Sequence, residues 1–316
     1  MILPDSLWAA SAAPAVGAPP LKGRNAADVV VIGGGFTGLS TALHLAEAGK
    51  SVIVLEAGEP GWCASGRNGG QVNPGWRMLP SEITAKYGRN RGPAVLDMLN
   101  KACDAAFDVI SRHGIDCDVE RPGFVHAGFD PLGKAFLDGW IREWGELGLA
   151  VERYDRAGLQ EFIGTDFYHF AKHDPRGGHL QPLSYARGLA RAAITQGATI
   201  HGHSRVDALH QKGGGWQVVT KGGSVDTEHI VICTNAYSDR LWPNLRKSII
   251  PISTQGGRNL VMFPQRAERS VRQIERRHQS SAVAPPSAFL RAIKPVSSSW
   301  IAGSMAGASY SARSCL

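Results

Sequence analysis

Three glycines and one carboxylate are the residues whose spacing points most clearly to chemistry. Gly33, Gly35 and Gly38 form a G-x-G-x-x-G motif, and Glu56 follows 18 positions after the last of them. Such glycines allow a tight turn, and they let the backbone approach a pyrophosphate closely. The amides at the start of the following helix would face the phosphates. Glu56 would accept hydrogen bonds from a ribose 2′-hydroxyl and repel a 2′-phosphate. The pattern therefore predicts a dinucleotide site that disfavours NADP.

The elements around this motif are those that such a site requires. Residues 28–32 form a continuous β-branched run, which is typical of a buried parallel strand. Apolar residues then recur at helical spacing over 39–46, and Gly49 ends the helix. Residues 52–55 form a second buried strand that carries Glu56 at its end. This strand–turn–helix–strand context makes the glycine motif specific.

The rest of the chain up to residue 253 also predicts a mixture of helices and strands. Residues 57–80 are expected to be a long ordered loop. Helices are expected over 93–113, over 132–147 and from Pro182 to a cap at Gly197, with a short strand over 124–127. Strands are expected over 199–200, 206–210, 216–220 and 229–233, and a glycine-rich turn joins the second to the third. The sequence thus predicts an α/β fold.

The segment after the second strand separates the possible dinucleotides. Residues 65–71 read SGRNGGQ, and their backbone amides could face a diphosphate or the pyrimidine edge of a flavin. This loop favours FAD, and an NAD-linked dehydrogenase is the disfavoured alternative.

With these motifs, the chain resembles the D-amino-acid oxidase/glycine oxidase superfamily of FAD-dependent amine oxidoreductases. Within that superfamily it is most similar to γ-glutamylputrescine oxidoreductase-like proteins. The resemblance covers residues 1 to about 253, and residues 254–316 do not share it. It rests on Pro4-Asp5-Ser6 and on the stretches VVVIGGGFTGLSTALHLAEAGKSVIVLEA, ASGRNGGQV, GGHLQPLSYARGLARAA and IVICTNAYS.

The resemblance implies a set of residues that hold FAD. Those expected at its ADP half are Gly33, Gly35, Phe36, Thr37, Gly38, Glu56 and Ala57. Those expected along the diphosphate and the ring system are Ser65, Gly66, Arg67, Asn68, Gly69, Gly70 and Gln71. The backbone of Val206 would meet the adenine, and Thr234 and Asn235 would end the strand that returns to the cofactor. Arg67 lies where some members carry a linking histidine, so noncovalent FAD is expected.

The resemblance also implies a domain organisation. Residues 28–82 and 181–253 would form a discontinuous, three-layer, Rossmann-like FAD-binding domain with a β-meander. Residues 83–180 would form the first part of an α+β substrate domain, which is incomplete because family members continue further. Residues 1–27 are expected to be an extended lead-in.

The implied activity is oxidation of a C–N bond in an amine or amino acid. The imine product would be hydrolysed, and the electrons would pass to O₂ or another acceptor. A γ-glutamylated polyamine is the first substrate that the family suggests, and a small amino acid is the second. No catalytic acid or base is assigned. The alternative is a truncated flavoprotein remnant without catalytic activity.

The net charge of +7 lies entirely in the last 66 residues. Residues 1–250 hold 25 basic and 25 acidic residues, whereas residues 251–316 hold nine basic and two acidic ones. Two interpretations of residues 254–316 remain open: a disordered basic arm, or sequence that results from a frame shift or truncation. We expect trypsin to cut this tail first, and we expect the protein to be poorly soluble. No aromatic residues interleave with its arginines, Arg266, Arg269, Arg272, Arg276 and Arg277, so a nucleic-acid partner is not expected.

Composition excludes several classes of protein. No apolar stretch approaches the roughly 20 residues that span a bilayer. The N-terminus does not read as a signal peptide, and the five scattered cysteines indicate a reduced, cytoplasmic protein without a zinc site.

For each of the other candidate residues, an ordinary structural role is at least as strongly favoured as a functional one. His201 and His203 lack a third metal ligand, and His179 reads as a loop histidine. Cys63 is expected to be a small buried apolar residue rather than a redox group. For Trp62, Trp76 and Tyr237, stacking on a ring and core packing are equally expected.

Overall fold

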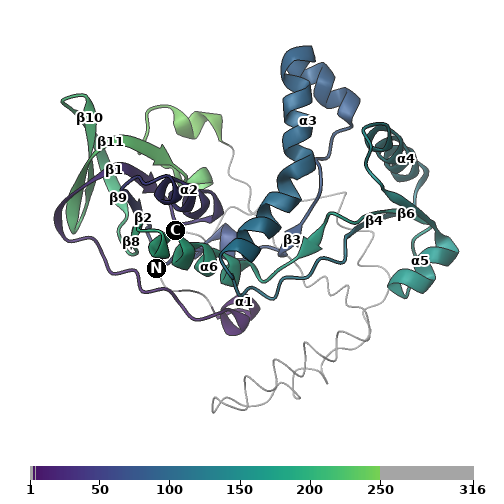
Figure 1. The fold of residues 1–316 in the computed structure, drawn as a ribbon, viewed down its shortest axis with the longest axis horizontal. Coiled ribbons are helices and arrows are strands. Elements are labelled where there is room, and N and C mark those ends of the chain that lie inside the picture. Colours follow the sequence, from purple (N-terminus) through teal and green to yellow (C-terminus); the bar gives the residue numbers. More distant parts are fainter. Residues whose placement is uncertain (1–2, 4, 250–316) are drawn as a thin grey trace, which may run out of the picture. The chain divides into compact units, whose positions relative to one another are not determined.

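The computed structural model of this chain describes residue 3 and residues 5–249, and its main feature is a six-stranded sheet (Figure 1). The strands lie in the order β8-β2-β1-β11-β10-β9. The predictions for residues 254–316 fall outside the described residues. The six strands are β1 (Gly23–Ile32), β2 (Val52–Leu55), β8 (Thr199–His201), β9 (Val206–Lys212), β10 (Gly215–Thr220) and β11 (Gly223–Ile232).

The sheet is parallel on one side and antiparallel on the other. Val30 of β1 pairs in parallel with Ile53 of β2 and with Ile230 of β11, and β8 runs parallel to β2. Strands β9, β10 and β11 form the expected antiparallel meander. β11 is one ten-residue strand that takes part in both arrangements. The predicted strand at 229–233 is therefore only the end of a longer one. Together the strands and helices confirm the α/β fold.

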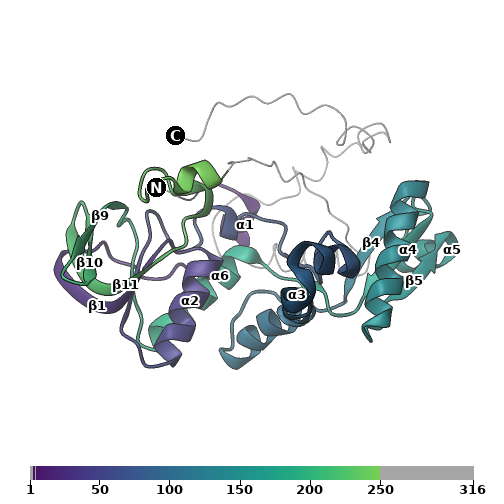
Figure 2. The same ribbon diagram turned by 90° about the horizontal axis from the view of Figure 1, so that it is seen from above.

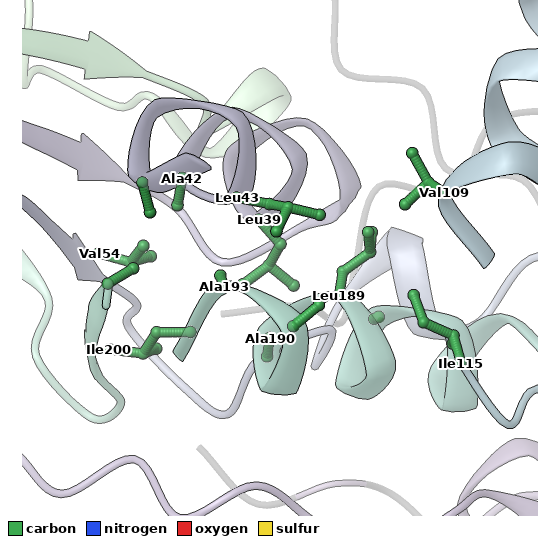
Figure 3. Packing of buried hydrophobic residues seen from close by; sticks show 14 of the residues in the cluster. Leu39, Ala42, Leu43, Val54, Val109, Ile115, Leu189, Ala190, Ala193 and Ile200 are labelled. Carbon is green, nitrogen blue, oxygen red and sulfur yellow. The ribbon is translucent and has the colours of Figure 1, made fainter. Parts of the chain in front are cut away.

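Both faces of the sheet are covered, which explains why its strands read as continuous apolar runs. Helices α2 (Phe36–Glu47) and α6 (Pro182–Thr195) contact one another (Figure 2) and pack on one face. Leu39, Leu43 and Ala193 meet Val54 and Ile200 there (Figure 3). On the other face a second cluster forms from residues of β1, β2, β9, β10 and β11 together with Leu21, which precedes β1. Its members are Leu21, Val30, Ile32, Ile53, Leu55, Val206, Val218 and Val225.

A separate three-stranded sheet lies between residues 124 and 174. It has the antiparallel order β4-β6-β5, with β4 at Phe124–Gly128, β5 at Glu152–Asp155 and β6 at Phe170–Asp174. Helix α4 (Pro131–Glu146) contacts this sheet, and so does α5 (Arg156–Ile163). The prediction includes β4 and α4 but misses β5, α5 and β6. Asp155 caps α5 by accepting from the amide of Gly158 at 2.9 Å, a signal that was readable in the sequence.

Two expectations about local structure are wrong, and the expected long loop over 57–80 is correct apart from two short elements. The N-terminal residues are not extended throughout, because they contain helix α1 (Leu7–Ser11); their last residues already belong to β1. The loop over 57–80 contains the 3₁₀ turn η1 (Ala64–Gly66) and the strand β3 (Gln71–Val72), which pairs with β7 (Gly178–His179).

The second error concerns α3, which runs from Pro80 to Arg112 instead of starting at residue 93. Its break lies at Gly88, whose φ of 76° is not helical, and Pro93 lies within the helix that follows. Two 3₁₀ turns, η2 (Asn235–Tyr237) and η3 (Leu245–Ser248), end the described chain. None of the helices within residues 5–249 is long and apolar enough to cross a membrane.

Candidate functional site

The glycine turn is packed so closely that side chains do not fit in it. Gly33 has a φ of +107°, and a Cβ there would lie 2.8 Å from the carbonyl oxygen of Cys233. A Cβ on Gly38 would overlap the carbonyl oxygen of Gly33. A Cβ on Gly35 would lie 2.8 Å from Ser65 Oγ. Each glycine of the motif thus permits a different close contact: Gly33 with the residue after β11, Gly35 with η1, and Gly38 of α2 with the turn after β1.

The start of α2 presents backbone donors. Gly35 is the N-cap and offers no side chain to cap the helix. The amide of Phe36 donates to Ser65 Oγ at 3.0 Å. Within residues 5–249 we find no hydrogen-bond acceptor for the amides of Thr37 and Gly38. Unpaired first-turn amides and the helix dipole suit an anion such as a phosphate.

Glu56 is held over this turn by two backbone amides. Its Oε2 accepts from the amide of Gly34 at 2.6 Å, and its Oε1 accepts from the amide of Gly58 at 2.7 Å. The half-buried carboxylate is therefore fixed in orientation, but each oxygen retains a further lone pair. An acceptor fixed in this way fits the hydroxyls of a ribose. Ala57 follows it directly, at the end of β2.

Asn68 organises the loop that follows. Its Nδ2 donates to the carbonyl oxygens of Ala64 and Ser65 at 3.1 and 2.9 Å, and its Oδ1 accepts from the amide of Gly70 at 2.8 Å. Gly70, with a φ of +69°, is bound in turn to the segment that leads into α6, because its carbonyl oxygen accepts from the amide of Leu180. Gly66 is buried, whereas Gly69 and Gln71 are exposed.

Arg67 and Cys63 form a polar group beside the loop. The guanidinium of Arg67 lies 5.0 Å from the ring centre of Trp62 and donates to Cys63 Sγ at 3.3 Å. The same sulfur lies 2.8 Å from the hydroxyl of Tyr237. Cys63 is only half-buried, so the expectation of a small buried apolar residue is wrong. Trp76 is 44% exposed and stacks on Tyr87, away from the core clusters.

The end of β11 returns to the glycine turn, as the sequence indicates. The amide of Cys233 donates to the carbonyl oxygen of Ile32 at 2.8 Å, which places Thr234 and Asn235 directly after the contact with Gly33. Val206 starts β9 and is buried in the second core cluster. Its strand begins near Glu56, because the amide of Ser204 donates to the carbonyl oxygen of Glu56 at 2.8 Å.

The three histidines singled out from the sequence have local partners. His201 Nδ1 lies 2.9 Å from the carbonyl oxygen of Pro19, and the amide of His203 donates to the carbonyl oxygen of Gly58. His179 pairs with Gln71 across β7 and β3. In the described part of the chain, no three His, Cys, Asp or Glu side chains are grouped as a metal ion would require.

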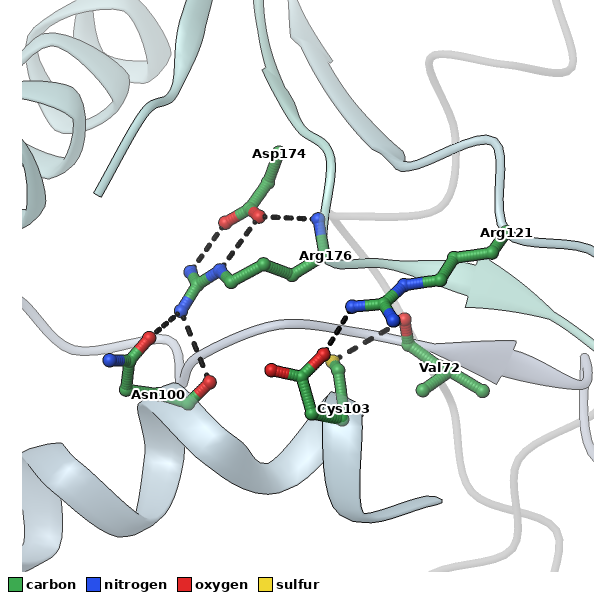
Figure 4. Close-up of polar contacts among 7 residues, drawn as sticks. Val72, Asn100, Cys103, Arg121, Asp174 and Arg176 are labelled. Atoms are coloured by element: carbon green, nitrogen blue, oxygen red, sulfur yellow. Dashed lines mark hydrogen bonds and ion pairs between the residues drawn. The ribbon is translucent and has the colours of Figure 1, made fainter. Parts of the chain in front are cut away.

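Sequence reasoning misses a buried ionic cluster between β6 and α3 (Figure 4). The side chain of Asp174 is fully buried, and Arg176 donates to it from Nε at 2.9 Å and from Nη2 at 2.6 Å. Arg176 Nη1 also donates to Asn100 Oδ1 of α3 at 2.6 Å. Charged residues are ordinarily exposed, and β6 reads FAKHD, so the sequence carries no signal that this cluster is buried.

Lys172, on the same strand, is also buried. It is 2% exposed, and its Nζ lies 3.4 Å from the ring centre of Trp140. The pKa of Lys172 is lowered from 10.5 to about 8, chiefly by burial; the carboxylate of Asp174 opposes this shift and the charge of Arg176 adds to it. An ammonium group in this place is therefore costly to keep charged.

Comparison with known proteins shows the family to which this chain is similar. A family model described as DAO, FAD dependent oxidoreductase, matches residues 28–291, which extends beyond residue 253. Gamma-glutamylputrescine oxidoreductase of Escherichia coli (strain K12) is 34% identical over 253 residues, covering 79% of this chain and 59% of that protein. The resemblance to the family is thus confirmed, but the expectation that it stops at about residue 253 is wrong, because the family match continues to residue 291. This chain spans less than two thirds of the E. coli relative.

Two solved structures have a similar fold. L-Amino acid deaminase from Proteus myxofaciens, in complex with anthranilate, is 25% identical with a TM-score of 0.62 over 72% of this chain and 50% of that one. Glycine oxidase from Geobacillus kaustophilus is 23% identical with a TM-score of 0.58, covering 72% of this chain and 59% of that one. The latter likeness concerns the fold alone.

Proposed function

This chain belongs to the DAO family of FAD-dependent oxidoreductases, and from that premise we propose that it binds FAD and oxidises a C–N bond of an amine or amino acid. The cofactor would lie against the glycine turn, with its ADP half at Glu56 and its diphosphate at the start of α2. Ser65 and the loop around Asn68 would lie along the rest of the molecule. The FAD would be held noncovalently.

One observation supports this proposal most: Glu56 is fixed by the amides of Gly34 and Gly58 beside the first-turn amides of α2. An acceptor for the ribose hydroxyls and donors for the phosphates thus stand next to one another, with no Cβ between them. This is the arrangement that a dinucleotide requires at its adenosine side. The residues present therefore fit the ADP half of FAD.

In the proposed reaction, the cofactor and the protein would have different roles. Bound FAD would supply a hydride acceptor, which takes two electrons and one hydrogen from the carbon next to the nitrogen, while the nitrogen loses a proton and water later hydrolyses the imine. The chain would hold the cofactor and orient the substrate. Residues 28–82 and 181–253 would form the cofactor domain, and residues 83–180 the first part of the substrate domain. The six-stranded and three-stranded sheets support this division, because each lies within one of the two parts apart from the start of β1.

The relatives suggest the substrate. A γ-glutamylated polyamine is our first candidate, since the E. coli protein named for gamma-glutamylputrescine is 34% identical. A small amino acid is the second. The electrons would pass to O₂ or another acceptor, and the reaction would take place in the cytoplasm.

The test is anaerobic reduction of the reconstituted protein. FAD is added to the purified chain, excess cofactor is removed, and the flavin absorption band is followed after addition of γ-glutamylputrescine, glycine or L-amino acids. Bleaching by one of them and re-oxidation by air support the proposal. A protein that retains FAD but is bleached by none of them is the inactive remnant, and one that binds NAD instead contradicts the flavin assignment. Heat denaturation should release the flavin into solution if it is noncovalent.

A further inference from the structure

The N-terminal segment, residues 7–22, is tied along its length to parts of the chain far away in the sequence. We call it the strap. At its far end, the amide of Leu21 donates to Ser204 Oγ at 2.8 Å. In its middle, the amide of Ala13 donates to Ser184 Oγ at 2.9 Å, and Arg191 of α6 donates to the carbonyl oxygen of Pro14 at 2.9 Å. At its beginning, α1 contacts α6 (Figure 1).

The side chain of Trp8, in the strap, donates a hydrogen bond to the loop 64–70. Its indole Nε1 donates to the carbonyl oxygen of Asn68 at 2.8 Å, across 60 residues of sequence. The backbone of Trp8 is held separately, because its carbonyl oxygen accepts from Gln181 Nε2 at 2.8 Å. Gln181 itself caps α6, since its Oε1 accepts from the amide of Ser184 at 2.6 Å. The backbone of Trp8 is thus held in place by Gln181, and its indole N–H donates to Asn68 from that position.

Asn68 transmits this contact to the glycine turn. Its side chain binds the carbonyl oxygen of Ser65, and Ser65 Oγ in turn accepts from the amide of Phe36 at the start of α2. The same side chain binds the amide of Gly70 at the other end of the loop. Three hydrogen bonds, linked through Asn68 and Ser65, therefore connect the indole N–H of Trp8 to the first turn of α2.

From these contacts we propose that Trp8 is a positioning residue for the cofactor loop 64–70, and that its hydrogen bond to Asn68 raises the affinity for FAD by ordering this loop. The proposal rests on the proposed FAD site. Without the indole N–H, Asn68 would lose the bond that holds its backbone, and Ser65 and Gly70 would be ordered less tightly. One neutral hydrogen bond contributes about 1 kcal/mol, which corresponds to about a fivefold change in an equilibrium constant.

The test compares Trp8→Phe with Arg191→Gln in the full chain. Trp8→Phe keeps an aromatic ring but removes the donor, whereas Arg191→Gln weakens the strap at Pro14, away from the loop. Hydrogen exchange is measured on the proteins without FAD. We expect the amides of residues 65–70 to exchange about fivefold faster in Trp8→Phe and at the wild-type rate in Arg191→Gln. Trypsin should also cut after Arg67 faster in Trp8→Phe alone.

FAD affinity is the second measurement. The Kd should rise about three- to tenfold in Trp8→Phe and stay unchanged in Arg191→Gln. Wild-type exchange in Trp8→Phe, or equal effects of the two variants, would overturn the proposal and reduce the strap to a general stabiliser. Because the exchange is measured without cofactor, a wild-type chain that takes up no FAD would overturn the proposed function separately.

Discussion

The carboxylate of Glu56 and the amide of Gly34 lie 2.6 Å apart, so the end of β2 is bound directly to the turn that follows β1. This contact joins the acidic residue to the glycine motif, two features that stand 22 residues apart in the sequence. It also fixes the direction in which the carboxylate can accept further hydrogen bonds. The proposed ribose contact therefore depends on a backbone turn as well as on a side chain.

Replacing Glu56 with Gln should weaken FAD binding on the order of tenfold. The amide side chain loses the charge, and its NH₂ group would face a backbone donor at Gly34 or Gly58, where hydrogen bonds to a charged group contribute about 1.5–3 kcal/mol. FAD titration followed by flavin fluorescence measures the effect. Glu228→Gln, an exposed residue of β11, is the control and should bind as the wild type does. Equal affinity in Glu56→Gln would contradict the assigned role.

Two glycine-to-alanine changes in helices should have opposite effects on stability. A Cβ on Gly38 of α2 would overlap the carbonyl oxygen of Gly33, so Gly38→Ala should cost about 2–3 kcal/mol of unfolding free energy. Gly145 of α4 faces open space, and Gly145→Ala should add about 0.5–1 kcal/mol. Urea denaturation measures both changes. A Gly38→Ala protein as stable as the wild type would show that the turn is not packed as described.

Two ion pairs near α3 should differ greatly in their contribution to the free energy of unfolding. Asp174→Ala leaves the mostly buried guanidinium of Arg176 without its carboxylate and should cost about 3–5 kcal/mol. Asp104→Ala removes the partner of Arg121, whose side chain is 42% exposed, and should cost less than about 1 kcal/mol. Thermal and urea unfolding of the two variants test this contrast. Similar losses in both would indicate that the Asp174 carboxylate is not buried as described (Figure 4).

Lys172 should make stability depend on pH in alkaline solution. Its pKa is lowered from 10.5 to about 8 in the folded chain, chiefly by burial. The unfolded chain therefore binds more protons between these two values, and stability rises as pH rises from about 8 towards 10.5. Below pH 8 the full cost of burying the charge is present, on the order of 3 kcal/mol by the size of the shift.

The variant Lys172→Met isolates this effect. It should be more stable than the wild type at pH 7 by about 1–3 kcal/mol, the contact with Trp140 offsetting part of the gain. The difference should shrink as the pH approaches 10. A constant difference from pH 7 to pH 10, measured by urea unfolding, would show that Lys172 titrates normally.

The sequence predicts the strand–turn–helix unit well because each residue there has a local reason. The β-branched run of β1 is buried on both faces, and Gly33 and Gly38 permit contacts that no other residue allows. The meander is predictable for the same reason, from its turn at Gly213 and Gly214, whose φ angles are positive.

The remaining elements depend on contacts between distant residues. Strands β5 and β6 carry charged residues such as Glu152, Lys172 and Asp174, and only the packing of α3, α4 and α5 shows which of these are buried. The strap is invisible in the sequence because its bonds join backbone groups to Ser184 and Ser204, roughly 170–180 residues away. The contact of Cys63 with Tyr237 likewise joins residues 174 positions apart.

The most direct test of the central claim is whether ADP or riboflavin, which represent the two halves of FAD, compete with FAD for the proposed site. All contacts that support FAD binding here lie at the adenosine and diphosphate side. The wild-type chain should therefore bind FAD in a one-to-one, saturable manner; ADP should displace it, and riboflavin should bind far more weakly than FAD. Calorimetric titration of the chain with FAD, alone and in the presence of ADP or riboflavin, gives the answer. An absence of saturable FAD binding, or FAD binding that ADP does not reduce, would contradict the account.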